Sequence, residues 1–119
     1  MNKRIVMNAL CAAAWAAACL PAQADDAIEA GKAAVDKYQC AGCHGKDFNT
    51  PVDPAYPKLA GQHAGFLEHS LMEYQRGSGA MNGRGNPIMN GMVKPLTRQD
   101  IHNIAAYLSS LPGSLVLQK

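Results

Sequence analysis

Aromatic side chains and long apolar stretches are both scarce in this chain. Its 119 residues include two phenylalanines, four tyrosines and a single tryptophan, Trp15, close to the N-terminus. After Leu20 no apolar run approaches the roughly 20 residues that a membrane span needs, so we expect no membrane span beyond that point. With so little aromatic mass in a small domain, we expect a bound group to fill part of the interior.

The first 24 residues have the organisation of a secretory signal peptide. Lys3 and Arg4 precede an apolar run over residues 5–20, and a small-x-small sequence ends at Ala24. The run is interrupted by Asn8 and is too short to span a bilayer. This pattern predicts export to the periplasm and cleavage after Ala24, which leaves a single domain over residues 25–119.

Cys19 offers a competing interpretation of the same segment, because a lipoprotein signal would carry a lipid on this cysteine. Such signals favour a larger aliphatic residue three positions earlier, where this chain has Ala16. We therefore favour ordinary cleavage over lipidation.

Loss of the signal also removes the excess of positive charge. Two of the eleven Lys and Arg residues lie within it, so nine basic residues remain against nine Asp and Glu residues. A nucleic-acid partner would require a basic face, and this balance predicts none.

Apolar residues at three- and four-residue steps predict helices, and no alternating pattern predicts a strand. In the second predicted helix the spacing places Phe66 on the inner face. The sequence therefore indicates an all-α fold of three or four short helices and long loops. The three clearest helices cover residues 26–39, 65–76 and 97–111.

Two of these helices carry a start signal. Asp26 and Glu29 resemble a capping box at the start of the first helix, and Thr97 and Asp100 have the same spacing at the start of the last. Residues 77–95 lie between predicted helices and are rich in glycine, asparagine and methionine, so we expect a loop there that holds no helix or strand for long.

The sequence Cys40-Ala41-Gly42-Cys43-His44 is the attachment motif of a c-type haem. Two thiols at this spacing reach the two vinyl groups on one edge of a porphyrin. The histidine beside the second thiol then lies over the iron as its first axial ligand. The motif thus predicts one covalently bound haem c.

A redox dithiol and a zinc site are the alternatives for these cysteines. A dithiol of this spacing is typical of a strand-helix unit, and no strand is predicted. Structural zinc needs four ligands. The remaining histidines are not at a second ligand spacing and are expected on the surface, namely His63, His69 and His102.

The second axial ligand decides whether the iron keeps an open position. A methionine opposite the histidine is the pattern of electron-transfer haems, and a histidine is the other possibility. Met72 lies in a predicted helix, where packing explains it. Met81, Met89 and Met92 all lie in the glycine-rich segment, and their positions alone do not rank them.

Three further segments follow the haem motif in order: YPKLAGQ at residues 56–62, MNGMVKPLT at 89–97 and IAAYL at 104–108. The set resembles class I cytochromes c, in particular the short single-haem periplasmic members and each half of the two-haem periplasmic cytochromes c. The resemblance covers nearly all of residues 25–119 and implies the cytochrome c fold around a single haem.

The resemblance implies roles for individual residues near the motif. Cys40 and Cys43 match the thioether cysteines, and His44 matches the proximal ligand. Pro57 matches the proline whose carbonyl accepts a hydrogen bond from the far nitrogen of that histidine, which fixes the tautomer of the ring.

On the distal side, Met89 stands seven residues before Leu96 and matches the methionine ligand of the family. Met92 matches a neighbouring methionine that does not bind iron, and it remains the alternative ligand. The resemblance also implies that the first and last helices pack together near Gly31 and Tyr107.

The implied function is one-electron transport through a haem that cycles between Fe(III) and Fe(II), with no enzymatic activity. The expected partners are a donor and an acceptor redox protein, for example a membrane-bound oxidase or dehydrogenase. Two alternatives remain open. One is a haem enzyme or gas sensor with an open axial position, and the other is a fixed electron-transfer subunit of a larger dehydrogenase or oxidase complex.

Overall fold

The computed structural model describes residues 22–114 and is all-α over that range, as predicted. No strand is present in these residues, and none of their helices is long and apolar enough to cross a bilayer. The predicted signal peptide lies outside the described residues except for positions 22–24. The helices are α1 (Ala22–Lys37), α2 (Ala41–His44), α3 (Ala64–Arg76), α4 (Pro87–Val93) and α5 (Arg98–Ser110).

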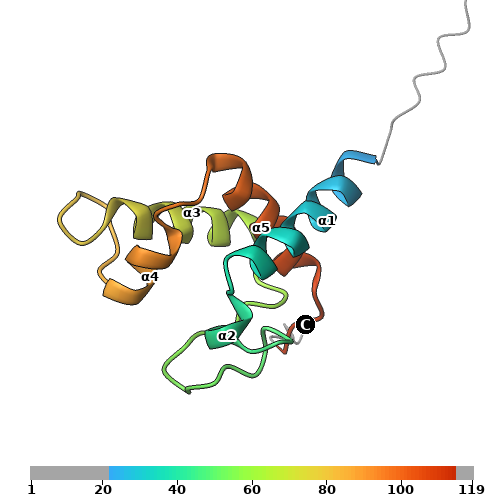
Figure 1. The fold of residues 1–119 in the computed structure, drawn as a ribbon, viewed down its shortest axis with the longest axis horizontal. Helices are drawn as coiled ribbons and strands as arrows, with labels where there is room; N and C mark the ends of the chain where they lie inside the picture. The colour runs from blue at the N-terminus through green and yellow to red at the C-terminus, as the bar shows by residue number, and fades with distance from the viewer. Residues whose placement is uncertain (1–21, 115–119) are drawn as a thin grey trace, which may run out of the picture.

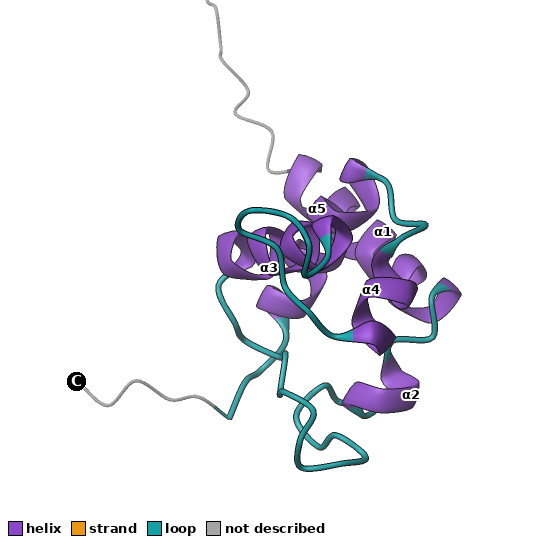
Figure 2. Ribbon diagram, turned by 90° about the vertical axis from the view of Figure 1, so that its left-hand side faces the viewer, coloured by secondary structure: helices purple, strands orange, loops and turns teal. Residues whose placement is uncertain are grey.

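The centre of the fold is the contact between α1 and α5, the most extensive between any two of these helices. Figures 1 and 2 show α1 beside α5, α3 against α5, and α4 near α3. At Gly31 a Cβ atom would lie 2.0 Å from the backbone oxygen of Asn103 and 2.6 Å from Cβ of Tyr107. Glycine therefore allows the two helices to approach closely, which confirms the expected packing of the first helix against the last near Gly31 and Tyr107.

A small apolar core surrounds this contact. The apolar stripe of α5, formed by Ile101, Ile104, Ala105 and Leu108, is buried. The ring of Phe48, from the loop after α2, meets Tyr107 edge to face with centroids 6.2 Å apart. Phe48 is the one aromatic residue among the buried apolar residues of the described chain. That core consists of Ala34, Val35, Phe48, Ala60, Leu67, Val93, Leu96, Ile101, Ile104, Ala105 and Leu108.

The predicted capping box at the start of α5 is present. The side chain of Thr97 accepts a hydrogen bond from the backbone N–H of Asp100 at 3.0 Å, and the Thr97 N–H donates to the Asp100 carboxylate at 2.9 Å. The hydroxyl of Tyr38 also donates to this carboxylate, which ties the end of α1 to the start of α5. These donors stabilise the charged form, and the pKa of Asp100 is lowered, mainly by the bond from the Thr97 N–H.

The predicted start of the first helix is wrong. The helix α1 begins at Ala22, so Asp26 lies within the helix and does not cap it. Alanine and glutamine have high helix propensity, and residues 22–24 extend the helix without needing a break at Asp26. The helix ends at Lys37, two residues earlier than predicted, and Gln39 then adopts a left-handed conformation with φ +56°.

The loop expected over residues 77–95 contains one short helix, α4, of seven residues, which the sequence did not reveal. Asn86 is the N-cap of this helix, and its side-chain oxygen accepts hydrogen bonds from the N–H groups of Ile88 and Met89 at 3.1 and 3.0 Å. Pro87 follows at the first helical position, where its fixed φ favours a helix and its missing N–H costs nothing.

The predicted second helix is confirmed as α3, but one residue of its inner face is misassigned. Phe66 is 52% exposed, and Leu67 and Ser70 are the buried residues of the helix. The guanidinium group of Arg84 lies 5.6 Å from the centre of the Phe66 ring. This cation–π contact explains an exposed aromatic ring at the position assigned to the core.

Substitution of Gly31 by alanine should destabilise the protein, because the new methyl group would overlap the backbone of α5. We expect the free energy of unfolding to fall by about 1–3 kcal/mol, the usual cost of overpacking. The matched control is Gly65→Ala in α3, where a Cβ would meet nothing within 4 Å, and this variant should gain about 0.5 kcal/mol through helix propensity. Guanidinium chloride unfolding of the haem-loaded variants measures both, and equal stability of the two would contradict the proposed contact.

The depressed pKa of Asp100 predicts an acid-dependent contribution to stability. A carboxyl group whose pKa is lower in the folded state stabilises the fold above its ordinary value of 3.8, and this contribution is lost as the pH falls below it. Asp100→Asn should therefore lower the free energy of unfolding near neutral pH. Urea unfolding of wild type and variant across the acidic range should show their difference shrinking as the pH decreases; a constant difference would contradict this assignment.

Candidate functional site

The haem motif folds as the single turn α2. The N–H of His44 donates to the carbonyl of Cys40 at 3.1 Å, which holds both ends of the motif in one turn. Gly45 ends the turn at φ +84°, and a Cβ there would lie 2.1 Å from the backbone oxygen of Thr50. Glycine is therefore required for the chain to leave the motif, and His44 remains 6% exposed inside the fold.

The orientation of the His44 ring is set by one hydrogen bond. Its Nδ1 lies 2.9 Å from the carbonyl oxygen of Pro57, and because a carbonyl can only accept, Nδ1 carries the proton. In the neutral ring Nε2 then has a free lone pair, the state in which imidazole binds a metal. The contact with Pro57 is the one that the resemblance implied.

The cysteines of the motif are half-buried and are not joined to each other. Burial raises the pKa of the Cys40 thiol, which favours its protonated form. Within residues 22–114 no cluster of three or more His, Cys, Asp or Glu side chains could hold a metal ion. The described residues thus offer no four-ligand zinc site, whereas two free thiols in one turn with His44 fit thioether attachment of a haem.

The other histidines of the described chain lie on the surface, as expected. His69 pairs with Glu73 at 3.0 Å and His102 with Glu68 at 2.8 Å, while His63 is exposed just before α3. Acidic neighbours account for two of the three, and no histidine other than His44 is buried among these residues.

The structure distinguishes the three methionines that their sequence positions left unranked, and it confirms the packing of Met72. Met81 is 89% exposed and Met92 is 41% exposed. Met72 packs against the core from α3, and its sulfur accepts a hydrogen bond from the guanidinium group of Arg98. Met89 is half-buried on the side of α4 that packs against the core. Of the three candidates in the glycine-rich segment, Met89 alone has an inward, partly covered side chain.

The sequence did not reveal the roles of Asn86 and Asn90, which lie on opposite sides of Met89 in the chain. Asn86 caps α4, and the amide group of Asn90 donates to the backbone oxygens of Tyr74 and Arg84. The dipeptide Asn86-Pro87 is a typical helix start and could have revealed α4. The bond from Asn90 to Tyr74 joins residues 16 positions apart and leaves no local pattern in the sequence.

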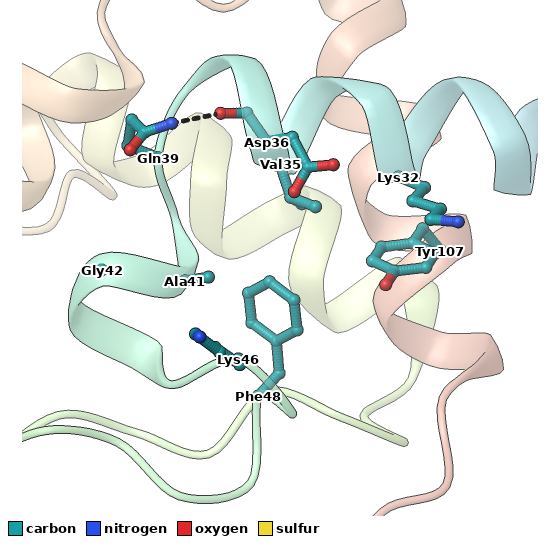
Figure 3. A pocket seen from close by; sticks show the side chains of 9 residues that line it. All are labelled: Lys32, Val35, Asp36, Gln39, Ala41, Gly42, Lys46, Phe48 and Tyr107. Carbon is teal, nitrogen blue, oxygen red and sulfur yellow. Dashed lines mark hydrogen bonds between the residues drawn. The ribbon is translucent and has the colours of Figure 1, made fainter.

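A shallow pocket of about 350 Å³ lies beside the motif (Figure 3). Ala41 and Gly42 line one side, and the residues around them include two lysines and one aspartate of opposite charge. None of the residues assigned to the haem lines this pocket, so it is a surface feature next to the motif. Its lining is Lys32, Val35, Asp36, Gln39, Ala41, Gly42, Lys46, Phe48 and Tyr107.

Comparison with known proteins identifies the family to which this chain belongs. The family model described as cytochrome c matches residues 28–112, most of the chain. The chain belongs to the cytochrome c family. The family and the motif together assign one covalent haem c, attached through Cys40 and Cys43 beside His44.

Individual relatives agree with this assignment. The chain is 46% identical over 89 residues to cytochrome c4 of Stutzerimonas stutzeri, covering 71% of this chain and 40% of that protein. It is 41% identical over 71 residues to cytochrome c-554(548) of Halomonas halodenitrificans, covering 60% of this chain and 82% of that protein. The crystal structure of reduced recombinant cytochrome c4 from Pseudomonas stutzeri superposes with a TM-score of 0.63 at 42% identity, covering 73% of this chain and 46% of that chain.

The extent of these matches has two consequences. The described helices adopt the cytochrome c fold, as the sequence predicted. The chain spans less than half of the cytochrome c4 proteins that it matches. It therefore corresponds to one haem-binding half of such a protein.

Covalent attachment can be tested by removing the thiols. In the wild type, extraction with acidified acetone should leave the haem on the polypeptide, because thioether bonds survive this treatment. The variant Cys40→Ala/Cys43→Ala should release all of its haem into the organic phase, while Met81→Ala, an exposed methionine, should behave as wild type. Retention of haem by the double variant, measured by the absorbance of the protein fraction, would contradict attachment at these cysteines.

Proposed function

We propose that this cytochrome c is a one-electron carrier in which His44 and Met89 are the two axial ligands of the haem iron. When bound, the haem supplies a reversible change between Fe(III) and Fe(II). The observation that carries the proposal is the pairing of a buried imidazole, with its Nε2 free, and a single inward methionine in the glycine-rich segment.

The contribution of the chain is to hold both ligands in place through the change of charge. Pro57 fixes the ring of His44 through Nδ1, so the coordinating nitrogen keeps one orientation and one tautomer. Met89 offers a neutral sulfur ligand, and a His/Met pair raises the reduction potential relative to other ligand pairs. With both positions filled, no site remains for a substrate, which supports a carrier in preference to an enzyme or gas sensor.

We also propose that residues 1–24 direct export and are cleaved after Ala24, so that the carrier works in the periplasm. Its partners are a donor and an acceptor redox protein, such as a membrane-bound oxidase or dehydrogenase. The balance of nine basic and nine acidic residues in the cleaved chain gives little long-range steering. Partner choice would then rest on short-range contacts, for which the charged residues Lys32, Asp36 and Lys46 beside the motif are candidates.

Substitution of Met89 tests the axial assignment. Met89→Ala should abolish the methionine-to-ferric-iron charge-transfer band, lower the reduction potential and allow carbon monoxide to bind the reduced protein, since the distal position would then be open. The matched control is Met92→Ala on the same helix, which should retain the band and exclude carbon monoxide. Optical spectra of the oxidised and reduced variants measure each of these properties. If Met89→Ala keeps the band and Met92→Ala loses it, Met92 is the ligand.

A further inference from the structure

Helix α4, which carries Met89, has a small apolar contact with the rest of the fold. Val93 is its one fully buried residue, while Ile88 and Met92 are exposed. Apolar burial is non-directional and here is limited, so it cannot by itself determine how α4 is oriented. The orientation of Met89 must therefore depend on other contacts.

The side chain of Asn90, directly after Met89, makes three hydrogen bonds. Its amide group donates to the backbone oxygen of Tyr74, in the last turn of α3, and to that of Arg84 at 3.0 Å. Its side-chain oxygen accepts from the backbone N–H of Asn86 at 3.1 Å. The half-buried side chain of Asn90 thus joins the end of α3, the loop between α3 and α4, and the start of α4.

Asn86 completes the arrangement from the other side of Met89. Its side-chain oxygen accepts from the N–H of Met89 itself at 3.0 Å, and its backbone oxygen accepts from the N–H of Asn90 at 2.8 Å. The two asparagines therefore bond to each other and hold the backbone of Met89 between them.

The loop that Asn90 holds is itself attached to α3. The N–H of Arg84 donates to the backbone oxygen of Glu73 at 3.0 Å, and its guanidinium group pairs with the Glu73 carboxylate. At the other end of α4, the amide of Gln75 donates to the backbone oxygens of Val93 and Leu96 at 2.9 and 2.8 Å. Both ends of α4 are thus bonded to the last turns of α3.

From this geometry we infer that Asn90 and Asn86 are positioning residues for the distal ligand, which act on Met89 through the backbone of α4. The inference rests on the proposed role of Met89. The asparagines set the fraction of time that Met89 is in its binding position, and so control access of other ligands to the iron and the reduction potential.

A purely structural role would give a different result. If the asparagines only stabilise the fold, their loss should lower the free energy of unfolding and leave the folded protein spectroscopically unchanged. Asp100→Asn provides this reference, because it weakens the cap of α5, where the Asp100 carboxylate is bonded to Thr97 and Tyr38 and to neither asparagine. Readouts on the folded protein at low denaturant therefore separate positioning from stability.

Asn90→Ala removes all three side-chain bonds, to the carbonyls of Tyr74 and Arg84 and to the N–H of Asn86. We expect a weaker charge-transfer band, a lower reduction potential and carbon monoxide binding to the reduced protein about tenfold faster or more, because binding is limited by the fraction of molecules in which Met89 is displaced. Asp100→Asn should show none of these changes. Wild-type values for the band, the potential and the rate in folded Asn90→Ala would overturn the inference.

A second pair of variants covers the case in which Asn90→Ala does not fold. Asn86→Asp keeps a side-chain acceptor for the N–H of Met89, and Asn86→Ala removes it. We expect Asn86→Asp to behave as wild type in all three measurements and Asn86→Ala to shift each in the direction given for Asn90→Ala. Equal behaviour of the two Asn86 variants would contradict a role for this cap in holding Met89.

The same measurements on the wild type distinguish failure of the inference from failure of the proposed function. If the wild type lacks the charge-transfer band and binds carbon monoxide readily, Met89 is not the ligand and the axial assignment itself is wrong. If the wild type behaves as a closed carrier and the asparagine variants match it, the axial assignment stands and the positioning role is wrong.

Discussion

The close approach of α1 and α5 at Gly31 is the constraint on which the rest of the structure depends. It brings Tyr107 to the surface of α1, and the rings of Tyr107 and Phe48 pack at right angles to each other. The backbone oxygen of Phe48 in turn accepts hydrogen bonds from the N–H groups of Leu59 and Ala60, which closes the loop that contains Pro57. The contact between α1 and α5 is thus connected, through Tyr107 and Phe48, to the loop whose Pro57 carbonyl orients His44.

The parts of the fold that the sequence predicted correctly are those governed by neighbours in the chain. The capping box of Thr97 and Asp100 and the apolar stripe of α5 depend on spacings of three and four residues, and both are present. The start of α1 and the side chain of Phe66 were predicted wrongly because context outweighed the local pattern. Good helix formers before Asp26 extend α1, and Arg84 covers a ring that periodicity assigned to the core.

The same distinction between local and tertiary information applies to the candidate site. The motif around His44 is read directly because its chemistry requires adjacent residues. The choice of Met89 among several methionines, and of Pro57 as the acceptor for His44, came only from resemblance to a family. A backbone carbonyl leaves no side-chain signature, and a methionine ligand differs from a packed methionine only in where it points. Both facts belong to tertiary structure, which periodicity does not encode.

The two sides of the haem site are held by different kinds of interaction. On the side of His44 the ligand lies within a turn whose carbonyl partner is fixed by the packed core. On the side of Met89 the ligand lies on a short helix held mainly by hydrogen bonds to the end of α3. Hydrogen bonds are directional, so a few of them can fix the orientation of a helix that buries little apolar surface. A core this small cannot pack tightly against both ligand-bearing segments. Hydrogen bonds to α3 therefore give Met89 a defined position where apolar packing is limited.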